Sequence, residues 1–362
     1  MRWSFRIGTF AGTEVRVHVT FLILLAAFGW MFHAEGGAAA ALDGVLFIVA
    51  VFACVVLHEF GHVLTAKQFG IRTPDITLLP IGGLARLERM PERPWQELLV
   101  AIAGPAVNVV IGFALLARFG VPALTPGLES MLEIPFGQRL MAVNFTLVIF
   151  NMIPAFPMDG GRVLRALLAM VLPYTRATEV AATIGQFLAV LGGLWGLAVM
   201  NPILMLIAIF VFMAARGEAQ MVQTRFALEG IPLERAMMTD FHVLRAGDSL
   251  SDAAAALLAG SQHDFPVLDG NGRLEGLLTR ALLFESITKA GSSTPVEEVM
   301  LREVPTVPLH YPLREAFQLL RASPIESLPV VAEDQRRVLG LLTAENVGEL
   351  ILIRNAMAGS GR

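Results

Sequence analysis

The sequence has a single cysteine, Cys54, and unusually few charged residues. One cysteine excludes an intramolecular disulfide framework and every zinc site of the CxxC type. Only 16% of the 362 residues are charged, whereas ordinary soluble domains carry about 25%. A surplus of basic residues is also missing, because the net charge is −4. The chain therefore lacks the basic surface of a nucleic-acid-binding protein, and we expect no nucleic-acid partner.

Apolar residues are abundant, at 55% of the chain, but their distribution is uneven. Residues 1–215 carry 13 Lys and Arg and 12 Asp and Glu, whereas the shorter segment 216–362 carries 14 and 19. A soluble core this apolar is improbable on composition alone, so most apolar side chains of the first segment should face lipid. This pattern predicts a polytopic α-helical membrane domain over residues 1–215, followed by a soluble acidic part.

Long runs almost without charge predict six membrane-spanning helices, since one span needs about 20 mostly apolar residues. The runs are Val17–Ala34, Gly44–Ala66, Leu98–Ala117, Leu140–Met158 and Val180–Ala215. The last run is too long for one span, and a turn at Asn201 and Pro202 should divide it into two helices, the second of them short. An alternative for the first run is a cleaved signal peptide with its cleavage region at Ala38–Ala41.

An even number of spans places both termini on the same side of the membrane. Eleven of the 13 basic residues of the membrane domain flank that side. Loops rich in Lys and Arg stay in the cytoplasm. We therefore expect a multi-pass protein of the cell membrane whose N- and C-termini are both cytoplasmic.

The second run contains the motif H-E-x-x-H, formed by His58, Glu59 and His62. Residues four apart share one face of a helix, so the two histidines can bind one metal ion. Glu59 can then act as the general base that deprotonates the attacking water. Ionisable residues inside a membrane segment are costly and indicate a functional site. The alternative is a polar patch that only bonds to neighbouring helices.

A catalytic zinc site needs three protein ligands, and Asp159 is the candidate for the third. It lies in the segment 151–162, where Pro154 and Pro157 interrupt the fourth run. Irregular backbone at membrane depth is tolerated where it lines a wet cavity, as hydrolysis requires. Asp159 as an N-cap of the helix that starts near Arg162 is the alternative. Cys54 lies about 12 Å of helix rise from His62, too far for one shared ion.

These two motifs together resemble the site-2 protease family of intramembrane zinc metalloproteases, because N-x-x-P-x-x-P-x-D-G follows HEFGH by about 90 residues. The resemblance implies that His58, His62 and Asp159 bind one Zn²⁺ per chain and that Glu59 is the general base. It implies a role in holding substrate or the oxyanion for Asn151 and for Asn108, which matches a further family element. It also implies regulated intramembrane proteolysis of a transmembrane protein in a prokaryote.

The loop between the second and third runs predicts a short β-hairpin over Ile76–Leu87, with a turn at Gly82 and Gly83. Similar proteins place a membrane-dipping hairpin here. An extended substrate could pair with it by strand addition. An ordinary cytoplasmic hairpin is the alternative.

The soluble part is an internal repeat with an offset of 63 residues, so that Met237 aligns with Met300 and Phe265 with Leu328. Each unit predicts the order strand, helix, strand, strand, helix. The repeat resembles a tandem of cystathionine-β-synthase (CBS) domains. We expect a connector over 216–231, the first domain over 232–292, the second over 293–355 and a tail over 356–362.

Many CBS pairs bind adenine nucleotides through Ser or Thr followed by Asp three residues later. Here Thr279 is followed by Leu282, which cannot accept a ribose hydrogen bond, and Thr343 is followed by Asn346, which can. Thr343 and Asn346 are therefore the candidate pair for an adenine nucleotide, set against a structural module, including one that makes the chain a homodimer.

Two other functional classes stay open at this point. One is a catalytically idle scaffold that keeps the metal for structure, although Glu59 is present. The other is a transporter or channel with a CBS regulator, which predicts charges spread over several spans. The clustering of ionisable residues at one centre favours the protease, with a transmembrane substrate and the lipid bilayer as its partners.

Overall fold

The computed structural model describes residues 3–80, 82–86, 88, 91, 93–121, 134–332 and 337–359. The chain divides into two compact units, Met1–Val222 and Gln223–Arg362, which are treated separately below. Ile81 and Leu87 of the predicted hairpin and the last three residues of the predicted tail lie outside the described residues.

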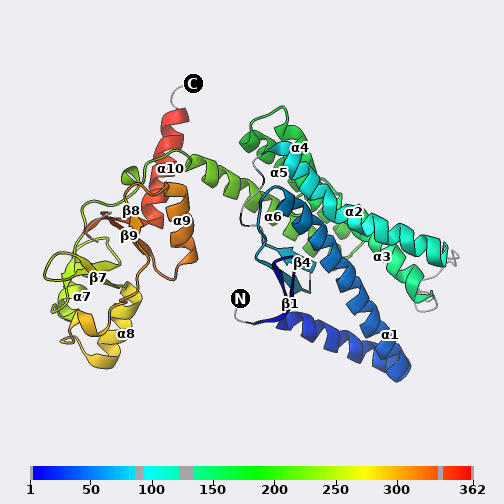
Figure 1. The fold of residues 1–362 in the computed structure, drawn as a ribbon, viewed down its shortest axis with the longest axis horizontal. Coiled ribbons are helices and arrows are strands. Elements are labelled where there is room, and N and C mark those ends of the chain that lie inside the picture. Colours follow the sequence, from blue (N-terminus) through cyan, green and yellow to red (C-terminus); the bar gives the residue numbers. More distant parts are fainter. Residues whose placement is uncertain are drawn as a thin grey trace. The chain divides into compact units, whose positions relative to one another are not determined.

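The first unit is mainly helical (Figure 1). Its helices are α1 (Val19–Gln68), α2 (Pro94–Phe119), α3 (Phe136–Asn151), α4 (Asp159–Ala169), α5 (Tyr174–Ala198) and α6 (Pro202–Ala227). Four helices of the described part are long and apolar enough to cross a membrane, namely α1, α2, α5 and α6. The predicted class, a helical domain with several apolar helices, is confirmed.

Helix α1 contains the first two predicted spans as two arms joined at a kink. Gly36 and Gly37 have non-helical dihedral angles, and the φ of Gly37 is 72°. A left-handed φ is accessible to glycine without a steric penalty, so the chain can reverse here within two residues. Figure 1 shows the two arms meeting at a sharp bend. Each of the other predicted runs also lies on a helix, α2, α3, α5 or α6.

Helix α3 ends at Asn151, ahead of Pro154 and Pro157, which were predicted to interrupt the fourth run. Two other predicted boundaries were wrong. Helix α4 begins at Asp159 rather than near Arg162. The last span is not short, since α6 continues for 26 residues to Ala227, into the predicted connector. The polar residues of that stretch are mostly good helix formers, so loss of hydrophobicity does not end the helix.

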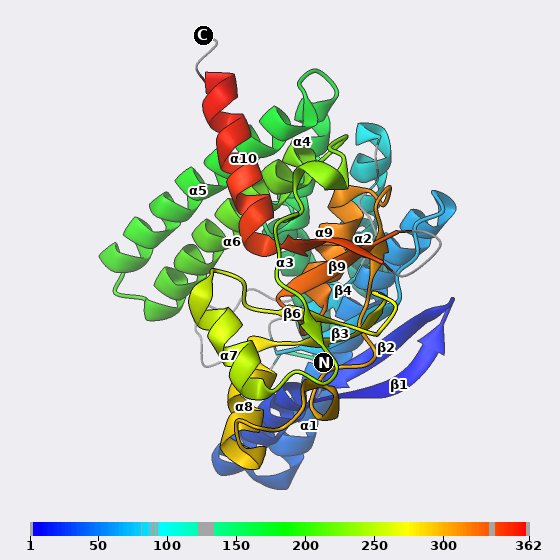
Figure 2. The ribbon, with the colours of Figure 1, turned by 90° about the vertical axis from the view of Figure 1, so that its left-hand side faces the viewer.

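A four-stranded sheet accompanies these helices, and its order is β1-β2-β3-β4. The strands are β1 (Ser4–Phe10), β2 (Thr13–His18), β3 (Asp75–Leu79) and β4 (Gly82–Ala85). Strands β2 and β3 are parallel because α1 connects them, and the outer pairs are antiparallel. The predicted hairpin corresponds to β3 and β4, but its predicted turn was wrong, because Gly82 and Gly83 lie in β4, paired with Leu79 and Leu78. Strands β1 and β2, visible in Figure 2, were not predicted.

The second unit is a duplicated mixed fold, as predicted. The first repeat contains β5 (Leu244–Arg245), α7 (Leu250–Ala259), β6 (Phe265–Leu268), β7 (Leu274–Leu278) and α8 (Arg280–Ala290). The second contains β8 (Val307–Pro308), α9 (Leu313–Ala322), β9 (Ser327–Val331), β10 (Val338–Thr343) and α10 (Ala344–Gly359). The two sheets have equivalent orders, β5-β6-β7 and β8-β9-β10.

Equivalent positions of the two repeats meet across an approximate two-fold axis. Asp264 accepts hydrogen bonds from the backbone N–H and the hydroxyl of Ser327, 63 residues later, at 3.0 and 2.9 Å. The segment before each repeat's first strand crosses to the other repeat, where Met238 pairs with Leu341 and Leu301 pairs with Leu277. The repeats therefore bury their apolar surfaces on each other.

Candidate functional site

Three donor atoms from two helices converge in the first unit. The Nε2 atoms of His58 and His62 are 3.1 Å apart, and Oδ2 of Asp159 lies 3.2 and 3.3 Å from them. All three side chains are buried. They form a cluster in which each residue offers one ligand atom within 4.8 Å of the others. The structure thus brings together the three residues predicted to bind metal.

The histidine atoms that face away from this cluster already have partners. Nδ1 of His58 donates to Oδ1 of Asn108 at 2.5 Å, and Nδ1 of His62 donates to the carbonyl of Val100 at 2.7 Å. A proton on each Nδ1 leaves the Nε2 lone pair free for a metal ion. Asn108 is held in turn by Asn144, whose Oδ1 accepts from its Nδ2 at 2.8 Å.

Asn108 was predicted on the resemblance as a substrate or oxyanion residue. It is fully buried behind His58, and its contact favours a role in orienting that ligand. Asn144, in α3, was not predicted from the sequence. Its partners, Asn108 and Cys54, are 36 and 90 positions away, so no local sequence pattern indicates these contacts. Asn151 is the last residue of α3 and is half-buried, and its predicted role stays a prediction.

Two glycines let α1 and α2 approach at the cluster. A Cβ added at Gly61 would lie 2.6 Å from the carbonyl oxygen of Ala103 in α2. A Cβ added at Gly104 would overlap Nε2 of His62 and lie 2.7 Å from Nε2 of His58. Only glycine at position 104 therefore leaves both ligand atoms unobstructed.

Asp159 begins α4, which a buried ion cluster fixes to its neighbours. Arg165, one and a half turns later, is fully buried. Its guanidinium donates through Nε to Glu97 of α2 at 2.7 Å and through Nη1 to Glu218 of α6 at 2.5 Å. Breaking such a buried pair leaves an uncompensated charge, which is strongly destabilising. The cluster therefore holds the helix that carries Asp159.

Glu59 lies beside the edge strand β4. A Cβ added at Gly83 of β4 would lie 2.7 Å from Cγ of Glu59 and 3.1 Å from its Oε1. Strand β4 ends the sheet, so one of its edges has no neighbour within the described sheet. Glu59, which follows His58 directly in α1, therefore lies against the face of the terminal strand of the sheet.

Cys54 does not belong to the cluster. Its Sγ accepts a hydrogen bond from Nδ2 of Asn144 at 3.5 Å. It is one turn from His58 on the side away from His62, and it is absent from the group of donor atoms that converge. This agrees with the expectation that it is a small buried residue.

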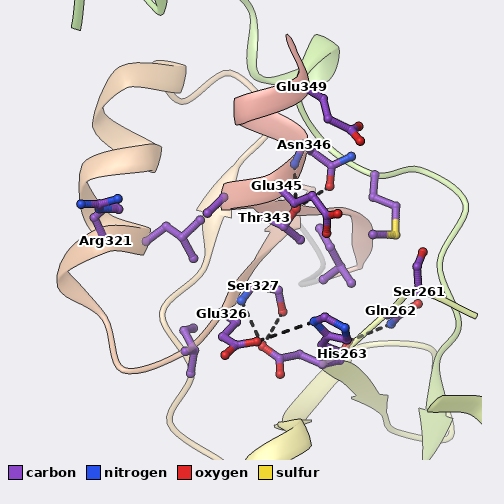
Figure 3. Close-up of a pocket in the computed structure, with 16 residues that line it drawn as sticks. Ser261, Gln262, His263, Arg321, Glu326, Ser327, Thr343, Glu345, Asn346 and Glu349 are labelled. Atoms are coloured by element: carbon purple, nitrogen blue, oxygen red, sulfur yellow. Dashed lines mark hydrogen bonds and ion pairs between the residues drawn. The ribbon is translucent and has the colours of Figure 1, made fainter. Parts of the chain in front are cut away.

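A separate cavity of about 490 Å³ lies between the repeats of the second unit (Figure 3). The first repeat contributes residues 261–264, and α9, β9, β10 and α10 contribute most of the rest. Thr343 and Asn346 line it, joined by a hydrogen bond of 2.5 Å between their side-chain oxygens. Burial raises the pKa of Asp264, another lining residue, although Ser327 donates to it.

The corresponding pair in the first repeat has the same capping hydrogen bond. Thr279 accepts from the backbone N–H of Leu282, as Thr343 does from that of Asn346, but the side chain of the third residue differs. Leu282 packs against the apolar core of its own repeat. The predicted role of Thr343 and Asn346 in binding a ligand stays a prediction.

Comparison with known proteins identifies the family of the first unit. Residues 46–125 and 130–192 match Peptidase family M50, and residues 233–289 and 296–352 match the CBS domain. The zinc metalloprotease MJ0392 of Methanocaldococcus jannaschii is 34% identical over 77% of this chain and 78% of its own length. The chain belongs to peptidase family M50.

Two further relatives extend this comparison. Stage IV sporulation protein FB of Bacillus subtilis is 26% identical over 79% of this chain and 96% of its own length. The solved site-2 protease from Methanocaldococcus jannaschii is 36% identical, and the match covers 60% of this chain and 95% of that one with a TM-score of 0.44.

This M50 chain is a zinc metallopeptidase of the site-2 protease type that carries a CBS pair. Zinc is its cofactor, and the donor set fits it. Two imidazole nitrogens and one carboxylate oxygen are the ligands of several catalytic zinc sites. The Nδ1 atoms of His58 and His62, which face away from the cluster, have hydrogen-bond partners, as is usual for histidines that bind a metal. His58, His62 and Asp159 are the residues that would hold the ion.

Proposed function

We propose that the protein hydrolyses a peptide bond in or near a membrane-spanning segment of a substrate protein. The observation that supports this best is the position of Glu59, which follows His58 directly and lies against the face of β4, the terminal strand of the sheet. Two of its three residues, His58 and His62, lie on α1, which is apolar and long enough to cross a membrane, and this favours a substrate that itself lies within the membrane.

The reaction needs a base and an acid, and Glu59 serves as both. Bound zinc would supply Lewis-acid chemistry, polarising the scissile carbonyl and making water a stronger nucleophile. The Glu59 carboxylate removes a proton from the attacking water as its oxygen bonds to the carbonyl carbon. Glu59 then delivers that proton to the leaving nitrogen as the C–N bond breaks. The amide of Asn151 is our candidate for a donor to the developing oxyanion.

A helical substrate hides its carbonyls in hydrogen bonds, so it must unwind before cleavage. Residues that weaken a helix, such as glycine and proline, are therefore expected near the cleaved bond. An extended segment can then add to the free edge of β4, where main-chain hydrogen bonds hold it beside Glu59.

The register of β4 indicates which amide faces that edge. The N–H of Arg86 donates to the carbonyl of Asp75 at 3.1 Å. Hydrogen-bonded and non-hydrogen-bonded pairs alternate in antiparallel sheets, so Thr77 and Leu84 also form a hydrogen-bonded pair. Ala85, between Leu84 and Arg86, therefore turns its N–H outward to the free edge.

Replacing Ala85 with proline should reduce cleavage about fivefold while zinc content stays unchanged, because one outward hydrogen bond, worth about 1 kcal/mol, is lost. The matched variant is Ala85→Val, which adds bulk at the same position and keeps the N–H. Cleavage of a single-span reporter with a glycine-proline interruption measures the effect. Equal activity in the proline and valine variants would contradict substrate pairing at β4.

For the membrane, we propose a multi-pass protein of the prokaryotic cell membrane with both termini in the cytoplasm. The uneven distribution of Lys and Arg supports this orientation. The CBS pair would then face the cytoplasm.

For the CBS pair, we propose that it binds an adenine nucleotide in the cavity at Thr343 and Asn346 and thereby regulates cleavage. The size of the cavity supports this, because pockets of 300–1,000 Å³ hold small ligands. Asn346 offers the amide that could hydrogen-bond a ribose hydroxyl. Homodimerisation through the CBS pair is a further proposal that the fold leaves open.

Saturating AMP, ADP and ATP should raise the unfolding temperature of the full-length protein in detergent, because a ligand that binds the folded state stabilises it. The shift should shrink in Asn346→Leu. The matched control is Thr279→Val, at the equivalent pair of the other repeat. No shift with any of the three nucleotides would contradict the nucleotide proposal and favour a structural role.

A further inference from the structure

Strand β1 exposes large apolar side chains along one edge of the first unit's sheet. Phe5 is 59% exposed and Ile7 64%, and Trp3, just before the strand, is 68% exposed. Phe10, at the end of β1, is 57% exposed. Soluble proteins protect edge strands with charges or short length and rarely leave such a row in water.

The strand register places these side chains on one face. Phe5 is opposite Val17, and Phe10 is opposite Thr13, both of which are buried. A β-bulge between Arg6 and Gly8 makes Ile7 the extra residue, so that Gly8 is opposite Val15 and the alternation shifts by one. Without this bulge, strict alternation would put Phe5 and Phe10 on opposite faces.

That face is turned toward the apolar helices. Val17 packs against Phe21 of the first arm of α1 and Leu78 of β3. The ring of Phe10 meets Phe60 of the second arm edge-on, with centroids 6.3 Å apart. Strand β1 is the outer strand, however, so its own side chains extend past these contacts and are left uncovered.

Two hydrogen bonds fix the level of β1 relative to α1. The N–H of Val19, where the first arm begins, donates to the carbonyl of Trp3 at 3.0 Å. Nζ of Lys67, near the end of the second arm, donates to the carbonyl of Ala11 at 2.9 Å. Strand β1 therefore runs between two ends of spanning arms, which is where a membrane meets water.

The opposite face of the hairpin is charged. Arg6 and Arg16 both lie near Glu14, at 3.6 and 2.6 Å. An apolar aromatic face next to spanning helices and a charged face away from them match the two sides of a bilayer interface, where Trp residues are enriched.

We propose that the β1 face, formed by Trp3, Phe5, Ile7 and Phe10, inserts into the bilayer interface. The occupant of this surface is lipid, and the apolar helices beside it continue the same lipid-facing surface. Since β4 belongs to the same sheet, this anchor sets the depth of β4, whose face contacts Glu59.

Spin labels on single cysteines test this directly, because Cys54 is the only native cysteine. In a Cys54→Ser background, we would place cysteines at Phe5 and Ile7 and, as matched controls, at Arg6 and Thr9. Each variant is reconstituted in vesicles of phosphatidylethanolamine and phosphatidylglycerol. Its zinc content shows that it has folded.

The ratio of collisions with oxygen, which partitions into lipid, to collisions with a water-soluble nickel chelate should be severalfold higher at positions 5 and 7 than at 6 and 9. Equal nickel access at all four positions would overturn the proposal, since the face would then be in water. Low access to both reagents at 5 and 7, with spin–spin broadening, would also overturn it, because a second copy of the chain would cover the face.

Discussion

Replacing Glu59 with glutamine is expected to lower cleavage by about 10²–10⁴-fold, the usual contribution of a general acid–base group. Glutamine has nearly the same size and shape as glutamate, but it cannot accept the proton of the attacking water. Glu59 is not one of the three converging donors, so zinc content should stay at the wild-type level. Cleavage of a single-span reporter and zinc per chain are measured on the same preparation.

A matched control is Glu179→Gln, which removes an exposed carboxylate from α5. It should cleave at the wild-type rate. The Glu59 variant also separates the functional classes that the sequence leaves open. A scaffold or a transporter does not use a general base, so the substitution would not impair it. Reporter cleavage at the wild-type rate by Glu59→Gln would contradict the protease mechanism.

Adding a single methyl group at Gly104 should have an effect of similar size. The Cβ of alanine would overlap Nε2 of His62, the atom that faces the other donors. Either the imidazole or helix α2 must then move. We expect zinc affinity to fall at least 10–100-fold, which is the usual effect of removing a group that hydrogen-bonds a metal ligand. Competition with a chelator measures the affinity, and cleavage should fall with it.

Alanine normally stabilises a helix relative to glycine by about 1 kcal/mol, so a loss in Gly104→Ala cannot be attributed to helix propensity. Ala106→Val is the matched control, because Ala106 lies on the same helix but is exposed. It should retain zinc and activity. Wild-type zinc affinity in Gly104→Ala would show that the close approach of α1 and α2 is not needed at the metal site.

Local sequence patterns predicted the parts of the site that lie close together in the chain. His58 and His62 are four residues apart in a helix, so their convergence follows from helix geometry alone. Asp159 is 97 residues beyond His62. The resemblance to a known motif, rather than any local rule, placed it at the same site. The repeat with its offset of 63 residues predicted the second unit, because each half carries the same alternation of strands and helices.

Other features depend on tertiary contacts that the sequence does not encode locally. Asn144 and the pairing of Arg165 with Glu97 and Glu218 join residues that are 36 to 90 positions apart. Strand β2 could have been found, since Thr13, Val15 and Val17 alternate with polar residues, but its proximity to the first apolar run concealed it. The length of helix α6 was underestimated, because the apolar run ends at Ala215 while the residues after it still favour a helix.

The most direct test of the account is the zinc content of the purified full-length protein, wild type and Asp159→Ala, after metal loading and removal of free metal. We predict about one zinc per chain in the wild type and a clear loss in the variant, because catalytic sites need three protein ligands. Cys54→Ser should retain its zinc, since Cys54 is outside the donor group. Absence of zinc from the wild type, or full zinc in Asp159→Ala, would contradict the three-ligand centre on which the mechanism depends.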